Sequence, residues 1–146
     1  MSRSNPYQNI ELQLPEGFRH EIEGFSGASV SVSSPFRRRV DLWFLAMCLA
    51  VNRDLDPQEG GSRWGFITGA IFESTQERIA FIELLAISVS GQVEIVREPR
   101  RVMGIANGLA EAGMPHLIEM LEEGRQKPLF NLIRSLQGEL VPVGEV

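Results

Sequence analysis

The sequence predicts a mainly α, compact single domain of about five helices, with a small two- or three-stranded β element. Its 146 residues fit one domain, which at this size buries about 68 to 70% of the surface of the unfolded chain. The run 42–51 is apolar throughout. It is too short for a membrane span, which needs about 20 residues, and too rich in Leu, Met and Ala for an ordinary strand. Later apolar residues recur at helical spacing between prolines and glycines, which typically start and end helices.

The N-terminal part carries no helical period. Small polar residues fill 24–34, where Val30 and Val32 alternate with serines, so a loop ending in one short strand is predicted there. We therefore expect three parts along the chain: an extended or strand-containing N-terminal segment at 1–33, a helical domain at 34–138 and a tail at 139–146.

The first long helix contains the apolar run. Ser34 supplies a cap and Pro35 occupies the first helical position, where its missing N–H costs nothing. The helix is predicted to continue to about Asn52 or Arg53 and to be buried on all sides. A loop follows at 54–62, because Asp, Pro and Gly dominate it.

The second helix is predicted from a capping box, in which Ser74 and Glu77 lie three residues apart. Its apolar residues continue to Gly91, a typical C-terminal stop. The preceding segment 64–72 is apolar but contains two glycines, so helix and strand both remain open there. The following segment, 92–97, is predicted to be a strand-like link.

Prolines and glycines delimit three further helices. Pro99 is predicted to open the third helix and Gly113 to break it. Pro115 then begins a fourth helix, which Gly124 ends. Pro128 begins a fifth, whose apolar residues form one stripe.

Composition restricts the function classes. The net charge is −5, so the chain as a whole repels nucleic acid and anionic lipid. The only cysteine, Cys48, lies inside the apolar run and is expected to pack as a small hydrophobe. No disulfide framework is possible, and the N-terminus lacks the apolar stretch of a signal peptide. A cytoplasmic protein without membrane association is the expectation.

No arrangement of residues predicts a reaction. His20, His116 and Cys48 lack the paired spacing of metal ligands, and no serine lies in a G-x-S-x-G motif. Glu83 interrupts an apolar stretch; the expectation is that it lies on a narrow exposed strip or pairs with arginine, although a carboxylate pair in the folded chain stays open. We therefore expect no enzyme, no catalytic residue, no metal and no cofactor.

Two arginine clusters are the remaining candidates for a site. Arg37, Arg38 and Arg39 are expected in the first turn of the first helix, where the helix dipole disfavours positive charge. A second cluster surrounds Pro99. The candidate binding residues, for a protein partner or for phosphates, are Arg37, Arg38, Arg39, Arg97, Arg100 and Arg101. Pairing with the many glutamates on a solvated surface is the alternative.

Three segments resemble the small proteins associated with bacterial DNA phosphorothioation systems. In that family a basic residue and an aspartate lead into an apolar first helix, as in 36–47, and a second apolar helix resembles 78–87. An Ala-Asn-Gly-Gly step corresponds to Ala106-Asn107-Gly108, although Leu109 replaces the last glycine. The resemblance ends near residue 121. It implies an accessory component of a phage-defence locus and carries over no catalytic residue.

The leading hypothesis is a non-enzymatic adaptor of a bacterial DNA-modification or restriction complex, acting through protein contacts. Its partner would be a larger subunit such as an ATPase or a nuclease, and DNA contact would occur only within the complex. The alternative is a small DNA-binding regulator. No helix carries a basic face along its length, which disfavours that alternative.

Overall fold

The computed structural model describes residues 4–27, 29–124 and 126–140. Within these residues the chain forms five α-helices, three short 3-10 helices and one two-stranded sheet. The elements are β1 (Glu11–Pro15), η1 (Glu16–Phe18), α1 (Arg19–Phe25), α2 (Arg39–Asn52), β2 (Arg63–Thr68), η2 (Gly69–Ser74), α3 (Gln76–Ser90), η3 (Val93–Arg97), α4 (Pro99–Glu122) and α5 (Pro128–Leu140). The prediction of a mainly α domain with a small β element is confirmed.

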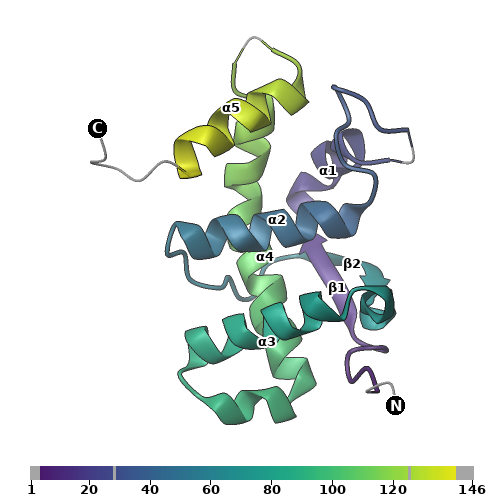
Figure 1. The fold of residues 1–146 in the computed structure, drawn as a ribbon. Helices are drawn as coiled ribbons and strands as arrows, with labels where there is room; N and C mark the ends of the chain where they lie inside the picture. The colour runs from purple at the N-terminus through teal and green to yellow at the C-terminus, as the bar shows by residue number, and fades with distance from the viewer. Residues whose placement is uncertain (1–3, 28, 125, 141–146) are drawn as a thin grey trace.

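Helix α4 is the central element of the fold. It runs the length of the molecule, and α2 and α3 cross in front of it in Figure 1. The predicted break at Gly113 and new start at Pro115 are wrong, because α4 is one continuous helix. Pro115 is exposed, so its ring lies on the solvent side of α4. Buried residues before and after it, Met114 and Leu117 among them, hold both halves against the core.

Gly113 serves the crossing of α2 and α4 instead of ending a helix. A Cβ at this position would collide with the backbone carbonyl oxygen of Ala46, and it would lie 3.2 Å from the backbone nitrogen of Ala50. The two helices therefore approach each other closely only because residue 113 has no side chain.

The sheet pairs two segments that are distant in sequence. Strands β1 and β2 are antiparallel, and the register shifts between Leu12 and Gln13. The described residues around Val30 and Val32 form no strand, so the prediction there is wrong; the strand of the N-terminal segment is β1, at 11–15. Leu12 and Leu14 point into the core and are fully buried. The choice between helix and strand at 64–72 is resolved as strand β2, which ends at Thr68, followed by the 3-10 helix η2.

Backbone contacts explain why α2 begins later than predicted. The N–H of Phe36 donates to the carbonyl of Phe25 (3.2 Å), and the N–H of Gly27 donates to the carbonyl of Phe36 (2.9 Å). This parallel bridge keeps residues 35 and 36 extended, so α2 begins at Arg39 and not at Pro35.

Three other local predictions also need correction. The capping box does not form, because Ser74 ends η2 and the N-cap of α3 is Thr75. The predicted strand-like link at 92–97 is η3. At the end of the chain, α5 extends to Leu140, and the rest of the predicted tail, 141–146, lies outside the described residues.

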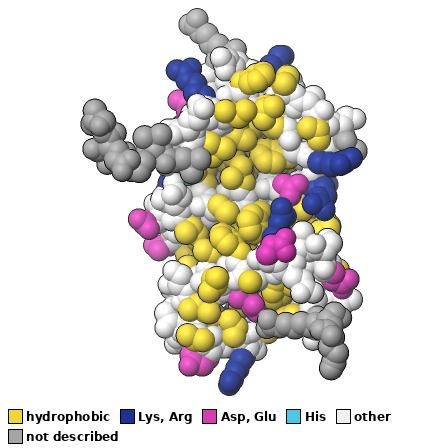
Figure 2. All heavy atoms as spheres, viewed as in Figure 1, with side chains coloured by type: hydrophobic (Ala, Val, Ile, Leu, Met, Phe, Trp, Pro, Cys, Tyr) yellow, Lys and Arg dark blue, Asp and Glu magenta, His cyan; other side chains and the backbone are white. Residues whose placement is uncertain are grey.

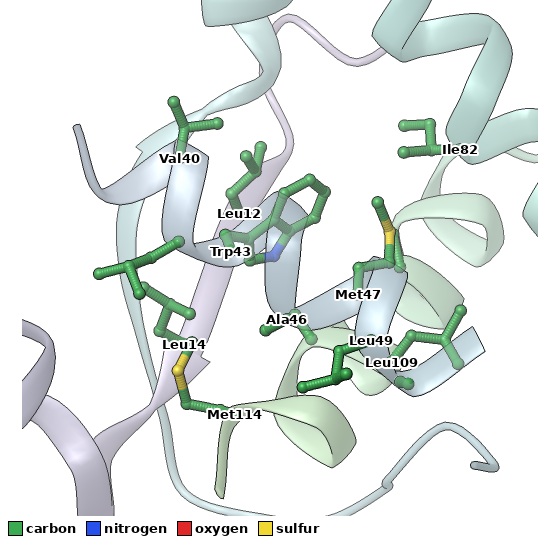
Figure 3. Close-up of a cluster of buried hydrophobic side chains, with 14 of the residues drawn as sticks. Leu12, Leu14, Val40, Trp43, Ala46, Met47, Leu49, Ile82, Leu109 and Met114 are labelled. Atoms are coloured by element: carbon green, nitrogen blue, oxygen red, sulfur yellow. The ribbon is translucent and has the colours of Figure 1, made fainter. Parts of the chain in front are cut away.

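The core lies where α2 and α4 meet β1 and α3. Figure 3 shows Trp43 at its centre, with Leu12 and Met47 nearby. Trp43 is fully buried, on the inner side of α2. Its ring packs 6.1 Å from that of Phe72, centroid to centroid. Burying an aromatic side chain of this size contributes a few kcal/mol to stability.

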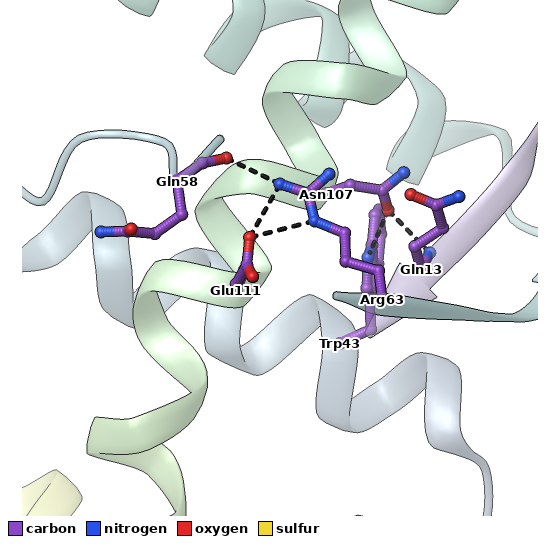
Figure 4. A network of polar contacts seen from close by, with 6 residues as sticks. All are labelled: Gln13, Trp43, Gln58, Arg63, Asn107 and Glu111. Atoms are coloured by element: carbon purple, nitrogen blue, oxygen red, sulfur yellow. Dashed lines mark hydrogen bonds and ion pairs between the residues drawn. The ribbon is translucent and has the colours of Figure 1, made fainter. Parts of the chain in front are cut away.

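One buried amide joins α2, α4 and the sheet (Figure 4). The Oδ1 of Asn107 accepts hydrogen bonds from Trp43 Nε1 (3.0 Å) and from the backbone N–H of Gln13 (2.8 Å). Its Nδ2 donates to the carbonyl of Glu11 (3.2 Å). The side chain of Asn107 therefore satisfies the outer edge of β1 much as a neighbouring strand would.

A largely buried ion pair fixes the 53–62 loop. Arg63 Nη2 lies 2.8 Å from Glu111 Oε2 and donates to the carbonyl of Gln58 (2.6 Å). The backbone N–H of Gln58 donates in turn to the carbonyl of Gly108 (3.0 Å). The loop is thereby held against the middle of α4.

None of the described helices combines the length and the apolar composition that crossing a bilayer requires.

Candidate interaction surfaces

The two predicted arginine clusters do not converge. All six side chains are exposed, but Arg37, Arg38 and Arg39 line one hollow beside β2, whereas Arg100 and Arg101 line another between α4 and the N-terminal segment. These hollows share no residue. In Figure 1 the starts of α2 and α4 lie at different levels of the molecule. A single phosphate site formed by both clusters is therefore excluded in this conformation.

The first cluster lies before α2 more than within it. Only Arg39 is helical and Arg38 is the N-cap, so the prediction that all three residues occupy the first turn is wrong. Arg38 Nε lies 3.8 Å from Asp41 Oδ2. The guanidinium of Arg39 lies 5.9 Å from the centroid of the Trp64 ring. Arg37 makes no ion pair or side-chain hydrogen bond with the described residues.

The second cluster is more dispersed. Arg97 ends η3, and Arg100 and Arg101 lie in the first turn of α4. Arg101 Nη1 is 2.9 Å from Glu98 Oε2, and both side chains are about half exposed. Such exposed pairs are worth about 0.2 to 1 kcal/mol. This cluster is therefore a partly neutralised, solvated surface.

A site that the sequence did not indicate lies on the outer side of α2. Phe44, Leu45 and Cys48 are only partly buried, and Val51 is 38% exposed. Their spacing places them on one side of the helix. The prediction that the apolar run is buried on all sides is therefore wrong. Cys48 is half-buried at the surface, whereas the sequence predicted that it packs inside the core.

The outer side of α3 continues this apolar surface. Leu84 is 65% exposed, and Phe81 and Leu85 are partly buried. The one carboxylate within this stretch, Glu83, turns inward instead. It is neither exposed nor paired with a described arginine, and it accepts a hydrogen bond from the hydroxyl of Tyr7 (2.9 Å). At these two neighbouring positions α3 thus buries the carboxyl group of Glu83 and exposes the side chain of Leu84.

One cluster of contacts joins the two helices. The rings of Phe44 and Phe81 lie 5.1 Å apart, and the Arg78 guanidinium lies 4.8 Å from the Phe44 centroid. Arg78 also pairs with Asp41 at 3.0 Å. We call the surface formed by Phe44, Leu45, Cys48, Val51, Phe81, Leu84 and Leu85 the apolar face.

Figure 2 shows this face from the front. Hydrophobic side chains cover its middle, over α2 and α3, and most charged side chains lie along its margins and right-hand side. Single exposed apolar residues are ordinary on protein surfaces, whereas a contiguous group surrounded by polar residues is typical of an interaction site.

The apolar face offers little for catalysis. Desolvation raises the pKa of the Cys48 thiol, although nearby Arg78 opposes the shift, so the thiolate that a nucleophile needs is scarce at neutral pH. No group of three His, Cys, Asp or Glu side chains among the described residues is placed to hold a metal ion. His116 Nδ1 lies 3.1 Å from Arg53 Nη1, on a different surface.

No family model, curated protein or solved structure matches the chain. Many residues on which the resemblance to phosphorothioation-associated proteins rests belong to the core: Trp43, Ile82, Ala106, Asn107, Ile118 and Leu121 are buried. They determine packing, so their pattern describes a fold more than a binding site.

Proposed function

We propose that this chain is a non-enzymatic interaction subunit that binds a larger protein partner through the apolar face. The observation that carries the proposal is the orientation of α3. Its carboxylate at Glu83 is buried against Tyr7, while Leu84 is 65% exposed. Water favours the opposite arrangement, so this surface is suited to being covered by another protein.

The composition of the face supports a protein partner. It presents aromatic and aliphatic side chains, and its nearest charges, Arg78 and Asp41, already neutralise each other at 3.0 Å. Interfaces of this kind have an apolar centre with aromatic anchors and a polar rim. Phe44 and Phe81, in contact at 5.1 Å, are the anchors that we expect to contribute most to binding.

A DNA-modification or restriction complex is the setting that the sequence resemblance suggests for this subunit. The alternative, a small DNA-binding regulator, has less support. The arginine clusters lie on separate surfaces, and the net charge of −5 opposes association with a polyanion.

Co-purification from the source cells tests the proposal. The tagged chain, expressed at its natural level, should retain a stoichiometric larger protein, identified by mass spectrometry. Leu84→Glu should lose that protein, because it places a charge in the centre of the apolar face. Val30→Glu is the matched control, since Val30 is 57% exposed and lies on the α1–α2 loop; this variant should retain the partner.

Two outcomes would contradict the proposal. The first is a partner retained equally by wild type and Leu84→Glu. The second is a homodimer that Leu84→Glu dissociates, without any additional subunit, in sedimentation experiments. Salt-dependent binding of duplex DNA by the purified chain alone would instead support the regulator.

A further inference from the structure

Strand β2 has an unpaired edge. The sheet contains two strands, and the outer edge of β1 is occupied by the side chain of Asn107. Outside the β1–β2 ladder, no backbone hydrogen bond between described residues involves 63–68. Gly65, Ile67 and Thr68 are exposed. An exposed edge of this kind presents free N–H and C=O groups to a further strand.

A basic hollow borders this edge. It measures about 330 Å³ and is lined by Phe66 and Ile67 of β2 together with Arg37, Arg38 and Arg39. We call it the arginine hollow. Figure 2 shows Lys and Arg side chains gathered at the right-hand margin, near the level where α2 begins.

The positive charge at the arginine hollow is poorly neutralised. Arg37 has no partner among the described residues, and Arg38 has only the long 3.8 Å contact with Asp41. Arg39 lies over the Trp64 ring at 5.9 Å, and the ring holds its guanidinium beside β2 without neutralising it. Arg19 lies over the same ring at 4.7 Å, but Glu16 and Glu23 pair with it at 3.5 and 3.1 Å, so it adds no free charge.

The unpaired edge of β2 and the arginine hollow together favour one chemical class of ligand. A strand edge recognises an extended peptide through its backbone, and arginines recognise carboxylates through paired hydrogen bonds. A second copy of β2 would bring its own arginines against these, so like charges disfavour self-pairing. A nucleic acid would leave the strand edge unused.

We propose that an extended acidic peptide segment binds here, adding to β2 as a third strand and directing carboxylates at Arg37, Arg38 and Arg39. This surface is distinct from the apolar face. It gives the chain a second contact, for an acidic linker or tail of a protein.

Fluorescence anisotropy with a labelled decapeptide of alternating Glu and Val tests the proposal. The decapeptide should bind the wild-type chain, while a decapeptide of alternating Lys and Val should not. Arg37→Glu should weaken binding by about tenfold or more, because it removes a charge-assisted hydrogen bond to a peptide carboxylate and puts a negative charge in its place. Arg97→Glu changes the net charge equally at an exposed, unpaired arginine elsewhere and should leave binding within about twofold.

Amide hydrogen exchange of the wild-type chain tests strand addition without any substitution. The decapeptide should slow exchange at backbone amides within 63–68 and leave α5 unchanged. Three results would overturn the proposal: no binding of the acidic decapeptide, equal weakening by Arg37→Glu and Arg97→Glu, or binding without protection of β2. Preferential binding of a single-stranded oligonucleotide at the arginine hollow would also overturn it.

Discussion

Helix α4 and the outer side of α2 and α3 are both rich in apolar residues, yet the molecule uses them in opposite ways. The inner surface of α4 is closely packed, with Gly113 against the backbone of Ala46 and Asn107 hydrogen-bonded to three groups. The apolar face leaves Leu84 mostly exposed. Apolar residues beside α4 therefore stabilise the fold, whereas those of the apolar face are left partly or mostly exposed to solvent.

Close packing also limits what each region tolerates. Protein interiors are packed as densely as organic crystals, so even a methyl group matters beside α4. A surface residue of the apolar face has no such constraint in the isolated chain. Similar substitutions in the two regions should therefore change the free energy of unfolding by very different amounts.

The largest expected effect separates two neighbouring aromatic residues. Trp43→Ala should lower the free energy of unfolding by about 3 to 5 kcal/mol, because it leaves a cavity in the core. Phe44→Ala, on the partly exposed side of α2, should cost about 1 to 2 kcal/mol. Urea unfolding followed by circular dichroism measures both. Equal losses would contradict the division of α2 into an inner and an outer side.

Replacing either of two glycines of α4 with alanine should change the stability of the protein, but with opposite signs. Gly113→Ala should destabilise the protein by about 1 to 3 kcal/mol, because its Cβ has no space against α2. Gly104→Ala meets no atom within 4 Å and should stabilise the helix by about 0.5 to 1 kcal/mol. Thermal unfolding of both variants checks the sign. Stabilisation by both would show that α2 and α4 do not approach closely at residue 113.

The smallest effect concerns the end of α5. Hydrogen bonds from Arg53 and Asn52 lower the pKa of the Glu139 carboxyl, against an opposing desolvation effect. A lowered folded pKa stabilises the protein at neutral pH, and this contribution disappears as the pH falls through that pKa. Glu139→Gln should therefore cost less than about 1 kcal/mol at neutral pH and nothing in acid. A difference that persists in acid would contradict this assignment.

Much of the fold could be predicted from local signals. Pro99 and Pro128 mark helix starts and Gly91 a helix end, because their backbone restrictions act locally. Gly113 and Pro115 misled the prediction, since tertiary packing against α2 overrides the local preference. Strand β1 was missed, although the alternation of Leu12 and Leu14 with polar residues is a strand signal.

The candidate site was less predictable. The sequence identified Arg37, Arg38 and Arg39, but their position beside β2, with Arg39 over the Trp64 ring, depends on the pairing of β1 with β2. The apolar face was missed because a continuous apolar run has no polar side from which an inner and an outer side can be inferred. The position of Glu83 was the available signal, and only the fold shows that this carboxylate points inward to Tyr7.

Alkylation of Cys48 tests the role of the apolar face most directly, since Cys48 lies on it and is the only cysteine in the chain. In the isolated native chain we expect slow but measurable labelling, because the thiol is partly accessible and desolvation raises its pKa. In the complex purified from the source cells, the rate should fall by about tenfold or more as the partner covers the face. An unchanged labelling rate in the complex would contradict the account.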